Sequence, residues 1–124
     1  MNKRIFFAVL ICVILVVLYS ANNGETCFSQ IVRDMGYFPE DEIYEAVEFT
    51  IPEKFNDVYL KYNALLKTGG FDLEPYKGKR CVRYTYLIPE KNARANIIVY
   101  DGRVIGGDIS GITLDGIMIP LEKS

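Results

Sequence analysis

The chain has 124 residues, half of them apolar, which suits one compact domain rather than two. Two of its 14 basic residues, Lys3 and Arg4, precede a long apolar run, and all 16 acidic residues follow it. The distal part is therefore mildly acidic and lacks the basic face that nucleic-acid binding requires, so we expect no nucleic-acid partner. Histidine is absent from the sequence, which excludes Ser-His and Cys-His nucleophile pairs and imidazole metal sites.

The run IFFAVLICVILVVLY over residues 5–19 carries no charge. A helix over residues 5–21 would be about 25 Å long, slightly short of the ~30 Å hydrocarbon core. We predict an uncleaved signal anchor, a transmembrane helix within residues 1–21, with its positively charged N-terminus inside and an extracytoplasmic domain over residues 22–124. The alternatives are a cleaved signal peptide that releases a secreted domain, although Leu18 or Tyr19 stands where a small residue is needed, and a buried helix.

Two helices are predicted in the distal domain. Apolar residues recur at helical spacing over residues 26–35, with Thr26 as N-cap and Gly36 as the stop. For the second helix, residues 50–53 have the Thr-x-x-Glu form of a capping box. An apolar stripe then runs to the pair Gly69-Gly70, and its members are Phe55, Val58, Tyr59, Tyr62, Leu65 and Leu66.

Strands are predicted over residues 45–51, 80–89, 95–100 and 103–109, with a further edge strand within residues 112–120. The dipeptide Asp101-Gly102 is a strong hairpin signal, and a regular hairpin there would place Ile97 opposite Gly106. The whole pattern predicts an α+β fold: an N-terminal transmembrane helix, then a small antiparallel sheet of three to five strands with two helices packed on one face.

The candidate chemistry is sparse, and we predict no catalytic, cofactor-binding or metal-binding residues. The sequence Gly106-Gly107-Asp108 invites comparison with the Gly-Gly-Asp signature of nucleotide cyclases, but the residues that should follow are different. We favour a structural interpretation, in which Gly106 lets a helix approach the sheet and Gly107 relieves a bulge. A disulfide between Cys27 and Cys81 is an open alternative to two unpaired thiols.

Tyrosine is plentiful, with nine residues and no tryptophan. Tyrosine offers a large, rigid contact area with a polar tip. We therefore name a possible binding surface that comprises Tyr44, Tyr76, Tyr100, Arg103 and Asp108. The alternative is that these rings are scattered and half-buried.

Three blocks of residues within 44–118 resemble a family. They are residues 51–63, with Ile51-Pro52 and Asn63, then residues 70–86, and finally residues 94–116, with IGGD and LDG. The family is a small domain of unknown function at the C-termini of secreted or membrane-anchored proteins of Gram-positive bacteria. The resemblance supports an anchor-plus-domain layout and supplies no activity, and Cys81 departs from the aliphatic residue that it leads us to expect.

Our leading hypothesis is a non-enzymatic extracytoplasmic module, held at the membrane by its N-terminal helix, that binds a protein or cell-envelope component. The alternative is a carboxylate-dependent hydrolase of envelope material that uses Asp108 with Asp72 or Asp115. A third hypothesis is an accessory protein that acts mainly through its transmembrane helix.

Overall fold

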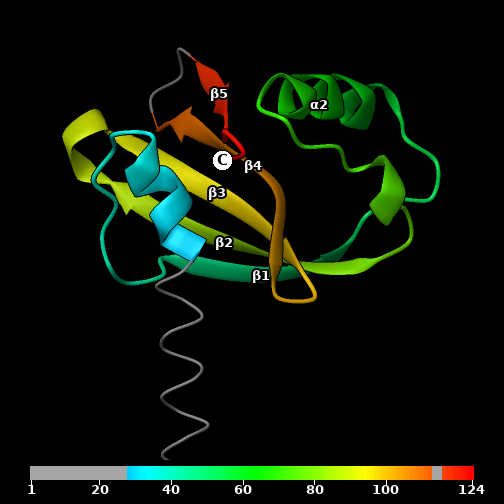
Figure 1. Ribbon diagram of the computed structural model, residues 1–124, viewed down its shortest axis with the longest axis horizontal. Coiled ribbons are helices and arrows are strands. Elements are labelled where there is room, and N and C mark those ends of the chain that lie inside the picture. The colour runs from blue at the N-terminus through cyan, green and yellow to red at the C-terminus, as the bar shows by residue number, and fades with distance from the viewer. Residues whose placement is uncertain (1–27, 113–115) are drawn as a thin grey trace, which may run out of the picture.

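A computed structural model describes residues 28–112 and 116–124. Its centre is a five-stranded antiparallel sheet in which the strands are neighbours in chain order (Figure 1). The strands are β1 (Glu45–Thr50), β2 (Arg80–Ile88), β3 (Ala93–Tyr100), β4 (Arg103–Gly111) and β5 (Met118–Pro120). Helix α2 (Asp57–Thr68) and a short 3-10 helix (Glu74–Tyr76) connect β1 to β2, and a second 3-10 helix (Pro89–Lys91) precedes β3. The predicted α+β class and strand number are confirmed.

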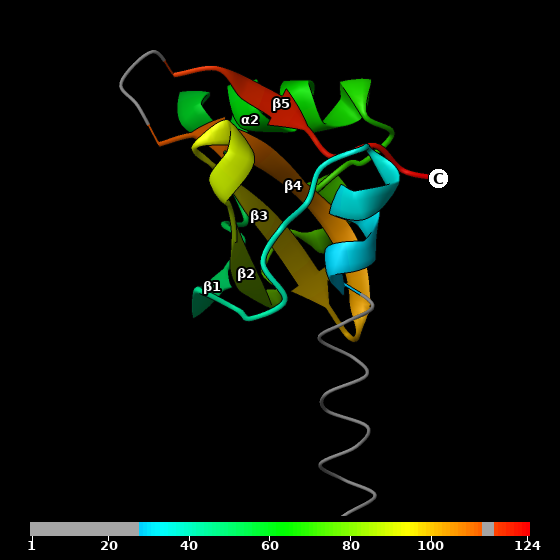
Figure 2. The same ribbon diagram turned by 90° about the vertical axis from the view of Figure 1, so that its left-hand side faces the viewer.

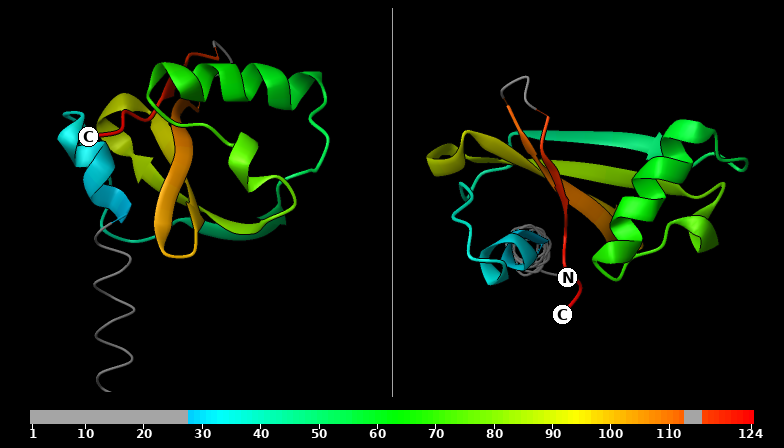
Figure 3. Two further views of the ribbon diagram at one scale, coloured as in Figure 1. Left: turned by 45° about the vertical axis from the view of Figure 1, so that its right-hand side comes forward. Right: turned by 90° about the horizontal axis from the view of Figure 1, so that it is seen from above.

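The prediction that both helices pack on one face of the sheet is wrong. The ring of Phe28, in the helical residues 28–34, stacks on the ring of Tyr84 with centroids 5.4 Å apart. On α2, Tyr62 instead donates a hydrogen bond to Asp108, which shares a face with Thr85. Successive side chains of a strand point to opposite faces. The first helical segment therefore covers the face of Tyr84, and α2 covers the opposite face, that of Thr85. Figures 1 and 3 show the cyan helical segment and α2 at separate places around the twisted sheet.

The first helical segment ends as the sequence predicted. Gly36 has a φ of +91° and donates its N–H to the carbonyl of Arg33 at 2.9 Å. Glycine adopts this left-handed backbone without the penalty that a Cβ brings. The predicted N-cap Thr26 lies outside the described residues.

Helix α2 begins later than the predicted capping box. Asn56 is its N-cap and accepts the N–H of Tyr59 at 2.9 Å, so the Thr50-to-Glu53 capping box is wrong. A short polar side chain is favoured at this position because it pairs an otherwise free helix N–H. The stop at Gly69-Gly70 is confirmed, with Gly70 at a φ of +94°.

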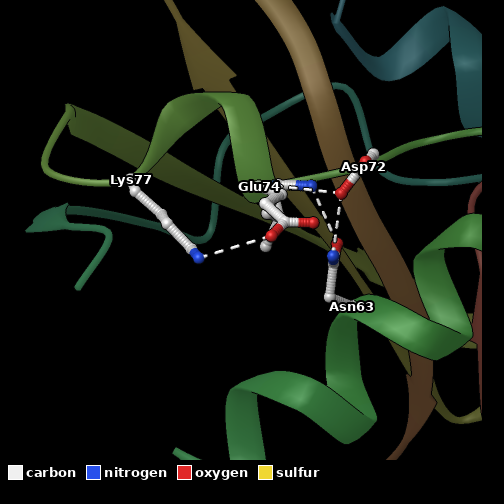
Figure 4. A network of polar contacts seen from close by, with 5 residues as sticks. Asn63, Asp72, Glu74 and Lys77 are labelled. Atoms are coloured by element: carbon white, nitrogen blue, oxygen red, sulfur yellow. Dashed lines mark hydrogen bonds and ion pairs between the residues drawn. The ribbon is translucent and has the colours of Figure 1, made fainter. Parts of the chain in front are cut away.

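A polar connection joins α2 to the segment that follows it (Figure 4). The buried Asn63 accepts the N–H of Leu73 at 2.7 Å and donates to the Asp72 carboxylate at 2.8 Å. Asp72 in turn accepts the N–H of Glu74 at 3.0 Å, at the start of the 3-10 helix. The Asn63 hydrogen bond, followed by the Glu74 N–H, lowers the pKa of Asp72. Asn63 therefore fixes the loop that returns the chain to β2.

The β3–β4 hairpin turns at Asp101-Gly102, where both residues have positive φ, as the sequence predicted. The predicted register is wrong beyond Val99, which lies opposite Val104. Gly106 lies opposite Ile98 rather than Ile97, because one extra residue on β4 forms a bulge. The bulge moves each later residue of β4 to the other face of the sheet.

The two glycines after the bulge have the structural roles that we expected in outline. A Cβ on Gly106 would lie 2.7 Å from Leu66 Cδ1 of α2. The absence of a side chain at Gly106 thus leaves room for Leu66 and lets the helix lie close to the sheet. A Cβ on Gly107 would lie 2.1 Å from the carbonyl oxygen of Asn96, and its φ is +145°. Gly107 therefore requires glycine, because its φ is positive and a Cβ would meet the backbone, whereas a Cβ at Gly106 would require the Leu66 side chain to move.

The core fills the space on both sides of the sheet. Its fully buried side chains come from the first helical segment, α2, the strands and the C-terminal segment; the largest are Tyr86, Ile51, Leu66, Leu73, Ile88, Ile97, Leu121 and Val32. Figure 2 shows the C-terminal segment as it leaves β5 toward the first helical segment. Among residues 28–112 and 116–124, no helix is long and apolar enough to cross a membrane. The apolar run at 5–19 and the membrane anchor predicted from it lie outside those residues.

Candidate functional site

An open groove of about 720 Å³ lies between α2 and the face of the sheet that α2 covers. Every strand contributes to its lining, as does the N-terminal half of α2. The apolar and aromatic lining residues are Tyr44, Phe49, Val58, Tyr59, Ile98, Ile112 and Met118, and the charged ones are Glu45, Arg83, Arg94 and Asp108. A groove of this size, mostly apolar with a few polar groups, is typical of ligand sites.

The floor of the groove is a row of polar side chains that crosses the central strands. Thr85 of β2 lies opposite Asn96 of β3, and Asn96 lies opposite Asp108 of β4. Residues directly opposite one another on antiparallel strands share a face. Without the bulge, Asp108 would lie opposite Ala95 on the other face, so the bulge is what completes this row.

Hydrogen bonds tie the row into one network that converges on Asp108. Asp108 Oδ1 accepts the Tyr62 hydroxyl at 2.6 Å, and Oδ2 accepts the Asn96 amide at 3.2 Å and the Ser110 hydroxyl. The same amide nitrogen donates to Ser110 Oγ at 3.3 Å, and Asn96 Oδ1 accepts the Thr85 hydroxyl at 2.9 Å. Each hydroxyl and amide of the network thus has a partner inside the network.

The electrostatics of the floor are set by a buried carboxyl group. Asp108 is only 3% exposed. Burial, and next the charge of Asp108, raise the pKa of the Tyr62 hydroxyl, so Tyr62 stays protonated and donates. No lysine or arginine nitrogen in the part of the chain that the structure describes lies within 4.0 Å of Asp108. Buried acidic side chains are usually paired, which makes Asp108 the unusual feature of this site.

Two arginines stand beside this floor in different states. Arg83 of β2 forms an ion pair with Glu45 of β1 at 3.4 Å. Arg94 of β3 is exposed, and its guanidinium carbon lies 5.1 Å from the centre of the Tyr44 ring. Among the described residues Arg94 has no carboxylate partner. Arg94 is therefore a cation that is available to a ligand.

Exposed apolar side chains border the groove. Val58 is 72% exposed, Tyr44 53%, Ile112 48% and Met118 45%, and all four contribute to the lining. Exposed apolar groups that gather around a hollow are typical of interaction sites, whereas single exposed ones are common on any surface.

The structure brings together only part of the predicted binding surface. Tyr44 and Asp108 both line the groove, with Asp108 in its floor. Tyr76 and Tyr100 contact each other edge to face at 5.6 Å and do not line the groove. Arg103 is exposed at the β3–β4 turn.

Of the two partners that we considered for a catalytic Asp108, the structure describes only Asp72. Asp72 is outside the groove lining and holds the connection to Asn63 described above. Asp115 lies outside the described residues. Glu45 is the other acidic residue of the groove, but it stands three strands away from Asp108 and is paired with Arg83. Within the described residues no group of three or more His, Cys, Asp or Glu side chains could hold a metal ion.

Cys81 is a free thiol buried in the sheet, where burial raises its pKa. Its sulfur lies 3.7 Å from the carbonyl oxygen of Lys79. Cys27, its possible disulfide partner, lies outside the described residues, as does Cys12.

Sequence reasoning did not identify Tyr62 as a donor, Thr85, Asn96 and Ser110 as parts of the floor, or Arg94 as a residue at its side. A signal was present, because Arg94, Asn96 and Asp108, Ser110 are polar residues at alternate positions of otherwise apolar strands. A single polar residue in a strand indicates a side chain that faces solvent. A row of polar residues across several strands and under a helix indicates a binding site. Recognising the row requires the correct register.

The comparisons with known proteins give one finding. The model of a protein family described as a domain of unknown function (DUF4830) matches residues 31–109. No curated protein and no solved structure matches the chain. The matched region begins within the first helical segment and runs through β1, α2, β2 and β3 into β4, and it contains most of the groove lining.

Proposed function

The chain belongs to the DUF4830 family, a domain of unknown function, and from its own geometry we propose that it is a binding module whose groove holds a protein or cell-envelope component. The observation that carries this proposal is the combination of a polar floor around Asp108 with exposed apolar side chains around it. Desolvated polar groups give specificity, and apolar groups at the border supply contact area.

The hydrogen bonds of Asp108 and the distance to its acidic neighbour on the groove favour a binding role over catalysis. Asp108 accepts three hydrogen bonds from Tyr62, Asn96 and Ser110, which hold the carboxylate in one orientation. Hydrolysis by a carboxylate pair needs a second carboxyl group within roughly 5–10 Å. The acidic neighbour on the groove, Glu45, is three strands away, about 14 Å at the usual strand spacing. A hydrolase that uses Asp108 with Asp115 is the weaker alternative.

In this proposal the apolar run at residues 5–19 anchors the chain in the cell membrane and places the groove outside the cytoplasm. Secretion after cleavage is the alternative. The support is the positively charged start, Lys3 and Arg4, before an uncharged run of this length.

A matched pair of substitutions on α2 tests the binding proposal. Val58 and Leu60 are both exposed, by 72% and 56%, but only Val58 lines the groove. The full chain and the variants Val58→Asp and Leu60→Asp are immobilised in mild detergent and exposed to envelope extract. We expect the full chain and Leu60→Asp to retain the same component and Val58→Asp to lose it. Equal capture by both variants, or none above a blank matrix, would contradict the proposal.

A further inference from the structure

We propose that the groove recognises a ligand end that carries both an ammonium group and a carboxylate, with the ammonium at Asp108 and the carboxylate at Arg94. This inference rests on the proposed binding function and adds the chemistry of the ligand.

The floor of the groove offers acceptors rather than donors. The hydroxyls of Tyr62, Thr85 and Ser110 and the amide of Asn96 all donate within the network. A carboxylate has about four acceptor positions, and Asp108 uses three of them. A ligand group that meets this floor must therefore donate a hydrogen bond.

The charge of the floor favours an ammonium group over a neutral donor. Asp108 is 3% exposed, and no basic nitrogen of the described residues lies within 4.0 Å of it. Hydrogen bonds between ionised groups are roughly twice as strong as neutral ones. An ammonium group would supply the positive partner that the protein's described residues do not.

Arg94 provides the opposite charge at the side of the groove. Its guanidinium lies against the Tyr44 ring at 5.1 Å and has no carboxylate partner among the described residues. Arg83, by contrast, is already paired with Glu45. A planar guanidinium matches a carboxylate with two parallel hydrogen bonds, so Arg94 is the better place for the acidic group of the ligand.

The register places Arg94 and Asp108 near each other on the same face of the sheet. Arg94 lies opposite Ser110, which is two residues beyond Asp108 on β4. The backbones of Arg94 and Asp108 are thus diagonal neighbours, about 7–8 Å apart. Apolar residues such as Ile98 and Met118 line the same groove. A short aliphatic chain between the two charges of the ligand would contact these apolar residues, as in a free amino acid with a side-chain amine or in a peptide that ends in lysine.

The test uses ε-aminocaproate, which joins one ammonium and one carboxylate by an aliphatic chain, and two analogues that each lack one charge, pentylamine and caproate. Binding to the full chain in detergent is followed by NMR through the amide signals of Asn96 and Ser110. We expect ε-aminocaproate to shift both signals, and each analogue to bind roughly tenfold more weakly. The comparison with caproate tests Asp108 without any substitution in the buried network.

Two arginine variants complete the test. Arg94→Met should weaken ε-aminocaproate binding about tenfold and leave pentylamine binding unchanged. Arg103→Met, which removes an exposed arginine outside the groove, should change neither. A lysine-ending peptide with a free carboxylate and the same peptide amidated then distinguish a chain end from a free amino acid as the source.

Several results would overturn the proposal. They are equal binding of ε-aminocaproate and either analogue, no effect of Arg94→Met, and no shift at Asn96 and Ser110 with any probe. If Val58→Asp still abolishes capture of an envelope component in these cases, the binding function stands and only the ligand chemistry is wrong.

Discussion

Asn63 is the residue through which the stability of this domain can be tested most directly. It is 5% exposed and makes two hydrogen bonds, to the N–H of the fully buried Leu73 and to the Asp72 carboxylate (Figure 4). In Asn63→Ala the Leu73 N–H is left buried without this acceptor, which costs about 1–3 kcal/mol, and the bond to Asp72 is lost, which costs about 1 kcal/mol. We expect a loss of about 2–4 kcal/mol in the free energy of unfolding.

The assay is urea unfolding of the full chain in mild detergent, followed by far-UV circular dichroism. With a slope near 2 kcal/mol per molar urea, the expected loss lowers the midpoint by roughly 1–2 M. Lys61→Ala, an exposed substitution on the same helix, is the control and should leave the midpoint within about 0.3 M. If Asn63→Ala is no less stable than Lys61→Ala, the connection does not hold the loop and our reasoning about it is refuted.

Four further predictions follow from single features of the structure. The pKa of Asp72 is lower in the folded chain than its unperturbed value of 3.8, so the ionised carboxylate stabilises the fold above pH 3.8, and this contribution is lost as the pH falls through the folded pKa. In Asp72→Asn the free energy of unfolding should therefore depend less on pH in this range, and an unchanged pH dependence would contradict this role of Asp72. Gly106→Ala places a Cβ 2.7 Å from the buried Leu66 and should cost about 1–3 kcal/mol in thermal or urea unfolding, whereas a neutral result would mean that α2 can move away. Asn56→Ala removes the α2 N-cap and should cost about 1 kcal/mol; no change in the urea midpoint would show that water replaces the cap. Burial raises the pKa of the Cys81 thiol, so alkylation should be slow in the folded chain and accelerate in urea, and fast labelling without denaturant would show that the thiol is accessible.

The sequence by itself determined the local elements. Gly36 and Gly69-Gly70 ended the two helical segments, and Asp101-Gly102 set the hairpin, because these positions depend on backbone conformations that few residues adopt. The alternation of apolar residues located the strands because a strand exposes its two faces in turn. The expected role of Gly106, which is to let a helix approach, was also readable from the sequence.

Two features could not be read from the sequence because it offered alternatives of similar quality. They are the start of α2 and the face of the sheet that each helix covers. Both Thr50 and Asn56 can cap a helix, and the sequence pattern favoured the first because Glu53 follows at the right spacing. The structure uses Asn56. The apolar stripe of each helix shows which side of that helix is buried, but it does not show which face of the sheet the helix covers.

The candidate site was decided by the tertiary structure alone. One extra residue in β4 moves Asp108 from beside Ala95 to beside Asn96, and places it under Tyr62 of α2. Gly107 indicated a bulge in this strand, but the position of the extra residue depends on how two strands and a helix pack together, so the sequence did not specify the register that follows it. The sequence therefore shows the residue types of the site, but only the tertiary structure brings them together in one groove.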